Sequence, residues 1–181
     1  MMTATRYELL GELEEEFLEG ELEEEALEFE STLPAPPFDK DPVSGCTAPG
    51  KPFDDFAFRS PAVPAKHGPR IKELATIIVH SWVKKPNQAI RTVCLEGHTD
   101  DVGSDNFNMR LGLARAQNLR DALELAIFDE ANKTGFGPQI FASVRIQVSS
   151  KGETKPVASN LGPTDALGRR RNRRVRFAFS T

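Results

Sequence analysis

The sequence predicts an α+β fold, a two-layer α/β sandwich in which a mixed sheet carries helices on one face. Two segments have the apolar periodicity of amphipathic helices, and several others alternate apolar and polar residues as strands do. The two kinds of segment follow one another along the chain. We expect the order β-α-β-α-β-β, in which both helices cover the same face of one sheet.

The first two expected elements lie between residues 55 and 84. Residues 55–59 (DFAFR) predict a short strand that ends at Ser60-Pro61. Pro69 suits the first turn of a helix, where its missing N–H is tolerated. Beyond it, apolar residues recur at the spacing of a helix with one buried face, at positions 71, 74, 75, 78, 79 and 82.

The remaining elements complete the predicted order. Residues 89–97 alternate as a strand, and Asn108 is a plausible N-cap for a second helix that runs to about residue 130. Residues 143–149 predict a third strand. Residues 160–172, rich in Gly, Pro and Arg, predict a loop that leads into a final strand at 173–180.

Two segments of unusual composition precede this domain. Residues 1–30 hold twelve Glu and one Arg and contain the repeat GELEEEFLE/GELEEEALE. Such a segment is either a solvated acidic tail or a segment that orders on docking to a partner. Residues 31–52 are rich in proline and predict a linker or an irregular strap. The folded domain is therefore expected over residues 53–181.

Composition limits the classes of protein further. No run approaches the roughly 20 apolar residues that span a bilayer. The first residues lack the basic and apolar regions of a secretory signal, so none is expected. Cys94 lies in an apolar run as a small buried residue would, although a Cys46–Cys94 bridge is also possible, and the redox compartment stays open.

Three motifs occur in order on the predicted elements. LEGHTD (95–100) ends the second strand, NFNMRLGLARA (106–116) opens the second helix, and NRRV (172–175) leads into the last strand. A weaker fourth sign is Gly152-Glu153 followed by Pro156-Val157. Together they resemble an OmpA-like peptidoglycan-binding domain over about residues 53–181.

The resemblance implies a non-catalytic domain that binds peptidoglycan through the diaminopimelate of its stem peptide and anchors a protein or an assembly to the wall. Diaminopimelate offers an ammonium and a carboxylate on one carbon. By resemblance, Asp100 accepts from the ammonium and the planar fork of Arg115 pairs with the carboxylate. Four further residues are implied to line or abut the site: Thr99, Asn108, Leu111 and Arg174.

Two positions depart from the family pattern. Arg59 stands where the family commonly has an Asp, which alters the charge or the specificity of the pocket. Gly112 stands where a Ser is usual, which weakens the start of the helix by up to about 1 kcal/mol.

Other functions are not expected. His98, Asp100 and Asp101 lack further metal ligands at a recognisable spacing, and no Ser or Cys is placed as a nucleophile. We therefore expect no metal, no cofactor and no enzymatic activity. The arginine-rich run 168–176 could suggest nucleic-acid binding, but it has few aromatic residues for base stacking. Its extra arginines, 169–171, are expected to meet wall polyanions or the acidic tail.

An alternative hypothesis gives the fold a structural role in a larger assembly, docked through residues 1–30. Similar Glu/Leu-rich leaders resemble those of proteins of phage-tail-like contractile injection systems. The family implies the cell envelope or periplasm, whereas the absence of a signal allows a cytoplasmic protein that meets the wall after assembly or release.

Overall fold

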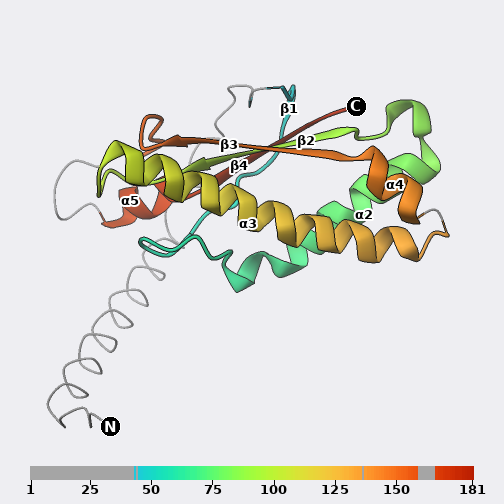
Figure 1. Ribbon diagram of the computed structural model, residues 1–181, viewed down its shortest axis with the longest axis horizontal. Coiled ribbons are helices and arrows are strands. Elements are labelled where there is room, and N and C mark those ends of the chain that lie inside the picture. The colour runs from blue at the N-terminus through green and yellow to red at the C-terminus, as the bar shows by residue number, and fades with distance from the viewer. Residues whose placement is uncertain (1–42, 44, 136, 159–165) are drawn as a thin grey trace, which may run out of the picture. The chain divides into compact units, whose positions relative to one another are not determined.

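The computed structural model describes residue 43 and residues 45–135, 137–158 and 166–181 (Figure 1). The expectations for the acidic tail, for most of the proline-rich segment and for residues 159–165 lie outside the described residues.

One four-stranded mixed sheet forms one layer of the domain. Its strands are β1 (Ala48–Pro49), β2 (Thr92–His98), β3 (Arg145–Gly152) and β4 (Val175–Ser180), in the order β1-β4-β2-β3. Strand β2 pairs with β3 in parallel and with β4 antiparallel, and β1 pairs antiparallel with β4. The predicted mixed sheet is therefore confirmed, with β2 and β4 at its centre.

The second layer consists of two long helices on one face of the sheet, α2 (Gly68–Lys84) and α3 (Asp105–Asn132) (Figure 1). Two short helices, α4 (Gly137–Ser143) and α5 (Ala166–Asn172), lie at opposite ends of the domain. Single 3-10 turns at Ala65–His67 and Pro86–Gln88 flank α2. This arrangement confirms the predicted α+β sandwich.

The core fills the space between the layers, as the sequence periodicity predicts. Every second residue of β2 and β4 faces the helices, and these residues pack against the apolar faces of α2 and α3. Burying each such side chain stabilises the fold by about 1.5–3 kcal/mol. The central members are Val93, Leu95, Val175 and Phe177 from the strands and Ile78, Val79, Leu119, Leu123 and Ile127 from the helices.

Three local expectations are wrong. Residues 55–59 do not form a strand, because Asp55 and Arg59 both have positive φ, at 59° and 53°, and only Phe53 bridges to Val175. The N-cap of α3 is Ser104, whose side chain accepts from the Phe107 N–H, so Asn108 lies inside the helix. The expected loop 160–172 contains helix α5 in its described part.

The folded body also begins before residue 53. Cys46 and Cys94 form a disulfide with a Cα–Cα distance of 6.0 Å, so Cys94 is not a free buried thiol. Val43 and Ala178 complete a small buried cluster with these two cysteines. Because β2 alternates, Cys94 points to the sheet face opposite the helices. The disulfide therefore fastens the segment before β1 to that face.

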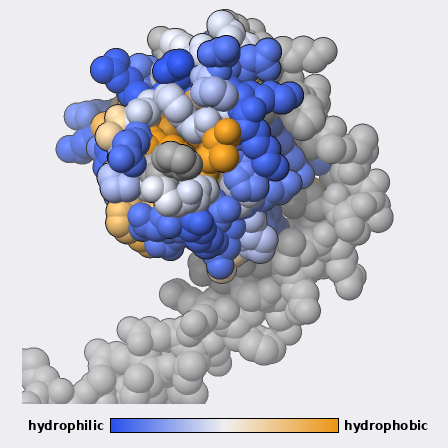
Figure 2. Space-filling view, turned by 90° about the vertical axis from the view of Figure 1, so that its right-hand side faces the viewer, coloured by the Kyte–Doolittle hydropathy of each residue, from blue (hydrophilic) through white to orange (hydrophobic). Residues whose placement is uncertain are grey.

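Figure 2 looks onto the end of the domain that carries α4 and shows a small apolar patch within a mostly hydrophilic surface. Trp82, Val83 and Ile140 line a hollow there. Strand β2 starts near this end and finishes at the other. Among the helices that the structure describes, none is both long and apolar enough to cross a membrane.

Candidate functional site

The candidate residues meet where β2 ends. Because β2 and β3 are parallel and β4 is antiparallel to β2, the ends of β2 and β3 and the start of β4 lie at the same edge of the sheet. The Thr99 N–H donates to the Gly152 carbonyl (3.0 Å), and the His98 N–H donates to the Arg174 carbonyl (2.8 Å). Helix α3 begins at this edge as well (Figure 1).

Two glycines bring α3 against β2. A Cβ built on Gly97 would overlap the backbone oxygen of Gly112, so only glycine allows this approach. A Cβ on Gly112 would in turn meet the Ser150 hydroxyl, which lies 3.3 Å from the Gly97 carbonyl oxygen. Glycine at 112 therefore leaves room for a hydroxyl that β3 supplies.

Asp100 is nearly buried beyond the end of β2, with 3% of its surface exposed. Its Oδ2 accepts a hydrogen bond from Arg173 Nη1 (3.1 Å), and the Nε of Arg173 donates to the Phe56 carbonyl (2.7 Å). The sequence motif pointed to Arg174, whereas Arg173 is the arginine that contacts Asp100. Strand alternation could have found it, because Arg173 and Val175 are two residues apart and Val175 faces the helices.

Arg115 is fully buried and organises the backbone around it. Its guanidinium donates to the carbonyls of Ala57 (3.0 Å), Ser60 (2.9 Å) and His98 (3.0 Å). Burial, with a smaller contribution from Arg173, lowers the pKa of Arg115 to about 10 against the attraction of Asp100. Arg115 thus interacts electrostatically with Asp100. Three of its five N–H groups join loop 57–60 to the end of β2.

The other predicted residues surround this pair at different depths. Asn108 is fully buried and donates through Nδ2 to Glu153, a residue that the sequence had offered only as part of a motif. Within the described chain, Asn108 Oδ1 and Thr99 Oγ1 are buried and have no hydrogen-bond partner. Leu111 is 9% exposed beside them. These two oxygen atoms are therefore polar groups whose hydrogen-bonding capacity is unused inside the site.

Arg174 belongs to the opposite face of the sheet. It donates to the carbonyls of Asn172 and Lys155 and lies near His98. On the same face, Glu96 accepts from Arg176 (3.0 Å) in a buried ion pair, and His98 Nε2 lies 3.2 Å from Glu96 Oε1. The structure therefore brings together five of the six predicted site residues and places Arg174 behind them.

Two of the extra arginines have partners within the domain. Arg169 pairs with Asp101 (3.0 Å), and Arg170 pairs with Asp55 (2.8 Å). These pairs fasten α5 beside the site, and the contacts of residues 169–171 with wall polyanions or with the acidic tail stay a prediction.

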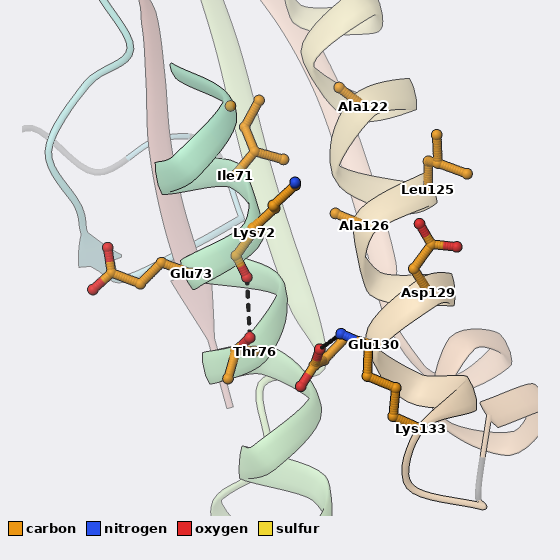
Figure 3. A pocket seen from close by; sticks show the side chains of 11 residues that line it. Ile71, Lys72, Glu73, Thr76, Ala122, Leu125, Ala126, Asp129, Glu130 and Lys133 are labelled. Atoms are coloured by element: carbon orange, nitrogen blue, oxygen red, sulfur yellow. Dashed lines mark hydrogen bonds and ion pairs between the residues drawn. The ribbon is translucent and has the colours of Figure 1, made fainter. Parts of the chain in front are cut away.

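A groove between α2 and α3 lies away from this site (Figure 3). Ile71 from one helix faces Ala122 and Ala126 from the other across an apolar floor. At one end Glu130 pairs with Lys133 (2.7 Å). None of the predicted site residues lines this groove.

The buried His98 predicts a stability that falls in acid. Desolvation, aided by Arg174 and Arg176 and opposed by Glu96, keeps the pKa of His98 below its ordinary value of 6.5. Below pH 6.5 the unfolded chain therefore binds a proton that the folded chain does not, and the free energy of unfolding should decrease until the folded-state pKa is passed. His67, whose pKa burial also lowers, adds to the same trend.

Urea denaturation at several pH values between 7.5 and 5, with NMR titration of each imidazole, measures this dependence. Replacing the half-exposed His80 with Gln serves as the control. A midpoint for His98 at or above 6.5 would contradict the expectation.

The fold and the residues at the end of β2 define a family. The OmpA family matches residues 56–173, well over half of the chain, and this protein belongs to it.

Several named relatives share this domain. The chain is 30% identical over 103 residues to the peptidoglycan-associated lipoprotein of Buchnera aphidicola, covering 57% of this chain and 48% of the relative. It is 36% identical over 86 residues to the outer-membrane lipoprotein YfiB of Pseudomonas aeruginosa, covering 48% and 42%. The matches thus span less than half the length of these relatives.

Solved structures agree on the fold. The peptidoglycan-associated lipoprotein from Burkholderia pseudomallei is 27% identical, with a TM-score of 0.52 over 80% of this chain and 99% of that one. The C-terminal domain of MotB from Helicobacter pylori is 24% identical, with a TM-score of 0.51 over 72% and 84%. The latter similarity concerns the fold alone.

Proposed function

We propose that this domain binds bacterial peptidoglycan without catalysis, through the diaminopimelate of the stem peptide, and thereby anchors a protein or an assembly to the wall. The observation that carries the proposal is the buried carboxylate of Asp100 at the end of β2, held beside the guanidinium groups of Arg173 and Arg115. Two relatives named as peptidoglycan-associated lipoproteins support the ligand class.

The arrangement suits a ligand head that carries both charges on one carbon. Asp100 Oδ1 is left to accept from an ammonium, while Arg173 bonds to Oδ2. In the proposed complex the ligand ammonium donates to Asp100 beside Arg173. The Arg173 side chain is 14% exposed, and its remaining N–H groups donate to the ligand carboxylate. Arg115 adds positive potential from below and fixes the loop.

Asn108, Thr99 and Leu111 complete the proposed pocket. Asn108 Oδ1 can accept and the Thr99 hydroxyl can donate or accept, so a ligand that opens the site gains partners in two buried groups, each of which costs about 1–3 kcal/mol while it has none. Leu111 offers an apolar wall for the methylene chain of diaminopimelate. Glu153 positions the Asn108 amide, and Arg174 supports the site from the far face of the sheet.

The disulfide fits a location in the cell envelope. Disulfides persist in oxidising compartments such as the periplasm and are rare in the cytosol. Cys46–Cys94 joins residues 48 positions apart, so its formation changes the stability of the whole domain. The relatives that are named for the outer membrane agree with this location.

Replacing Asp100 with Asn should weaken binding to isolated sacculi about 10- to 100-fold. The change removes one charge-assisted hydrogen bond of about 1.5–3 kcal/mol, and each 1.4 kcal/mol is a factor of ten in affinity. Co-sedimentation with purified sacculi at increasing protein concentration gives the apparent Kd.

Asp121→Asn is the matched control, since Asp121 is an exposed acid on α3 whose one ion pair among the described residues is with its neighbour Arg120. Circular dichroism must show that both variants are folded. Equal retention of the wild type and the Asp100 variant would rule out the pocket.

A further inference from the structure

Loop 57–60 stands at the mouth of the proposed site in a fixed conformation. Two arginines hold the backbone of this loop and of the residue before it. The Phe56 carbonyl accepts from Arg173, and the carbonyls of Ala57 and Ser60 accept from the buried Arg115. Of the same two arginines, Arg173 donates to Asp100 and Arg115 interacts electrostatically with it. The arginines of the proposed site therefore also hold this loop in place.

Arg59 occupies the tip of this loop in a strained backbone conformation, with φ 53°. A non-glycine residue in this region costs about 1 kcal/mol or more and persists where its surroundings impose it. Here the guanidinium bonds on both sides impose it. Arg59 is exposed at this position.

The Arg59 side chain is exposed and available. Its guanidinium carbon lies 5.2 Å from the centre of the Phe58 ring, which is itself 52% exposed. Arg59 forms no ion pair with any carboxylate among the described residues, whereas Arg169 and Arg170 of α5 are both paired. The Phe58 ring holds the guanidinium at the surface without neutralising it.

The arginines around the site differ in what they already bind. Arg173 donates to the nearly buried Asp100, Arg115 donates to three carbonyls, and the exposed Arg59 stands on the loop that these two arginines hold. A single ammonium–carboxylate head needs one anion and one cation, which Asp100 and Arg173 supply while Arg115 is engaged with backbone carbonyls. The exposed cation of Arg59 on the adjoining loop fits a ligand that carries a second carboxylate outside the head.

We propose that Arg59 is a specificity-determining residue that pairs with the free α-carboxylate of the glutamate preceding diaminopimelate in the stem peptide. The domain then distinguishes stems with a free carboxylate from stems in which this group is amidated. This inference rests on the proposed function, because it assumes that diaminopimelate occupies the Asp100 pocket.

Two synthetic tripeptides test it: L-alanyl-γ-D-glutamyl-diaminopimelate and the analogue with D-isoglutamine in the middle. Isothermal titration calorimetry on the wild type should give about fivefold tighter binding of the free acid, as expected for an exposed charge pair. Arg59→Ala should bind both peptides with the affinity that the wild type has for the amide. High salt should reduce the wild-type preference in the same direction.

Arg145→Ala is the matched control, because Arg145 is an exposed arginine at the opposite end of β3 from the site. It removes the same charge and should leave the preference unchanged. Asp100→Asn should weaken both peptides equally and keep their ratio.

The outcomes separate the two proposals. If the wild type binds both peptides equally, or Arg59→Ala keeps the preference, the role of Arg59 is overturned while wall binding stands. If the wild type binds neither peptide, the proposed function and the role of Arg59 fall together.

Discussion

Arg115→Met should lower the free energy of unfolding by about 3–5 kcal/mol and abolish ligand binding. The substitution keeps an unbranched apolar stem but removes three charge-assisted hydrogen bonds, each contributing about 1.5–3 kcal/mol, and leaves the His98 carbonyl buried without its donor. Part of the loss is recovered because water can reach the carbonyls of Ala57 and Ser60 on the exposed loop. Urea denaturation, with the midpoint and slope fitted together, gives the change.

Arg120→Met on the same helix is the control. Arg120 is partly exposed and pairs with Asp121 at the surface, so its loss should change stability by less than about 1 kcal/mol. Arg115→Lys should lie between the two, since it keeps the charge but cannot reach three carbonyls at once. A stability for Arg115→Met within 1 kcal/mol of the wild type would contradict the role assigned to this residue.

Cys46→Ser should lower the free energy of unfolding by about 4 kcal/mol. The disulfide closes a loop with a sequence separation of 48 residues, and the chain-entropy relation gives about this value for a loop of that length. Thermal or urea unfolding of the oxidised wild type and of the variant measures the difference.

Reduction provides the internal control. The wild type with reductant and the double variant Cys46→Ser/Cys94→Ser should have similar stability, and reductant should not change the double variant. If reduction of the wild type shifts its stability by less than about 1 kcal/mol, segment 43–50 does not depend on the disulfide.

The sequence was most informative where one strong periodicity decides the structure. The apolar positions of α2 and the alternation of β2 predicted both elements, because burial against a neighbouring layer imposes their period. The resemblance carried by the motifs at the end of β2 and at the start of α3 indicated Asp100, Asn108 and Arg115 as site residues. The order of the elements explains why the end of β2 and the start of α3 lie at one edge of the sheet.

The wrong predictions share a physical cause: contacts with residues far away in the sequence override the local conformational preference of a segment. Residues 55–59 alternate like a strand, yet their neighbouring carbonyls are captured by arginines more than 50 residues away. Ser104 competes with Asn108 as N-cap, and both residues suit that position. The Cys46–Cys94 pairing depends on where the proline-rich segment crosses the sheet, which no local pattern encodes.

The site shows the same limit. The NRRV motif predicted that an arginine would approach the pocket, but only the direction of β4 selects Arg173 over Arg174. The pairing of Glu153 with Asn108 joins the loop after β3 to helix α3. Such contacts arise from tertiary packing and become visible only when the strands are in register.

In the proposed anchoring role, the Cys46–Cys94 bond also determines the path of mechanical force. Tension that arrives along the chain ahead of Cys46 crosses a covalent bond into β2, and Asp100 lies six positions further along that same segment. This tension does not pass through β1. Otherwise its two paired residues, Ala48 and Pro49, would separate from β4 one after the other. Pulling along β2 instead loads its ladders with β3 and β4 in shear, so that many hydrogen bonds resist together.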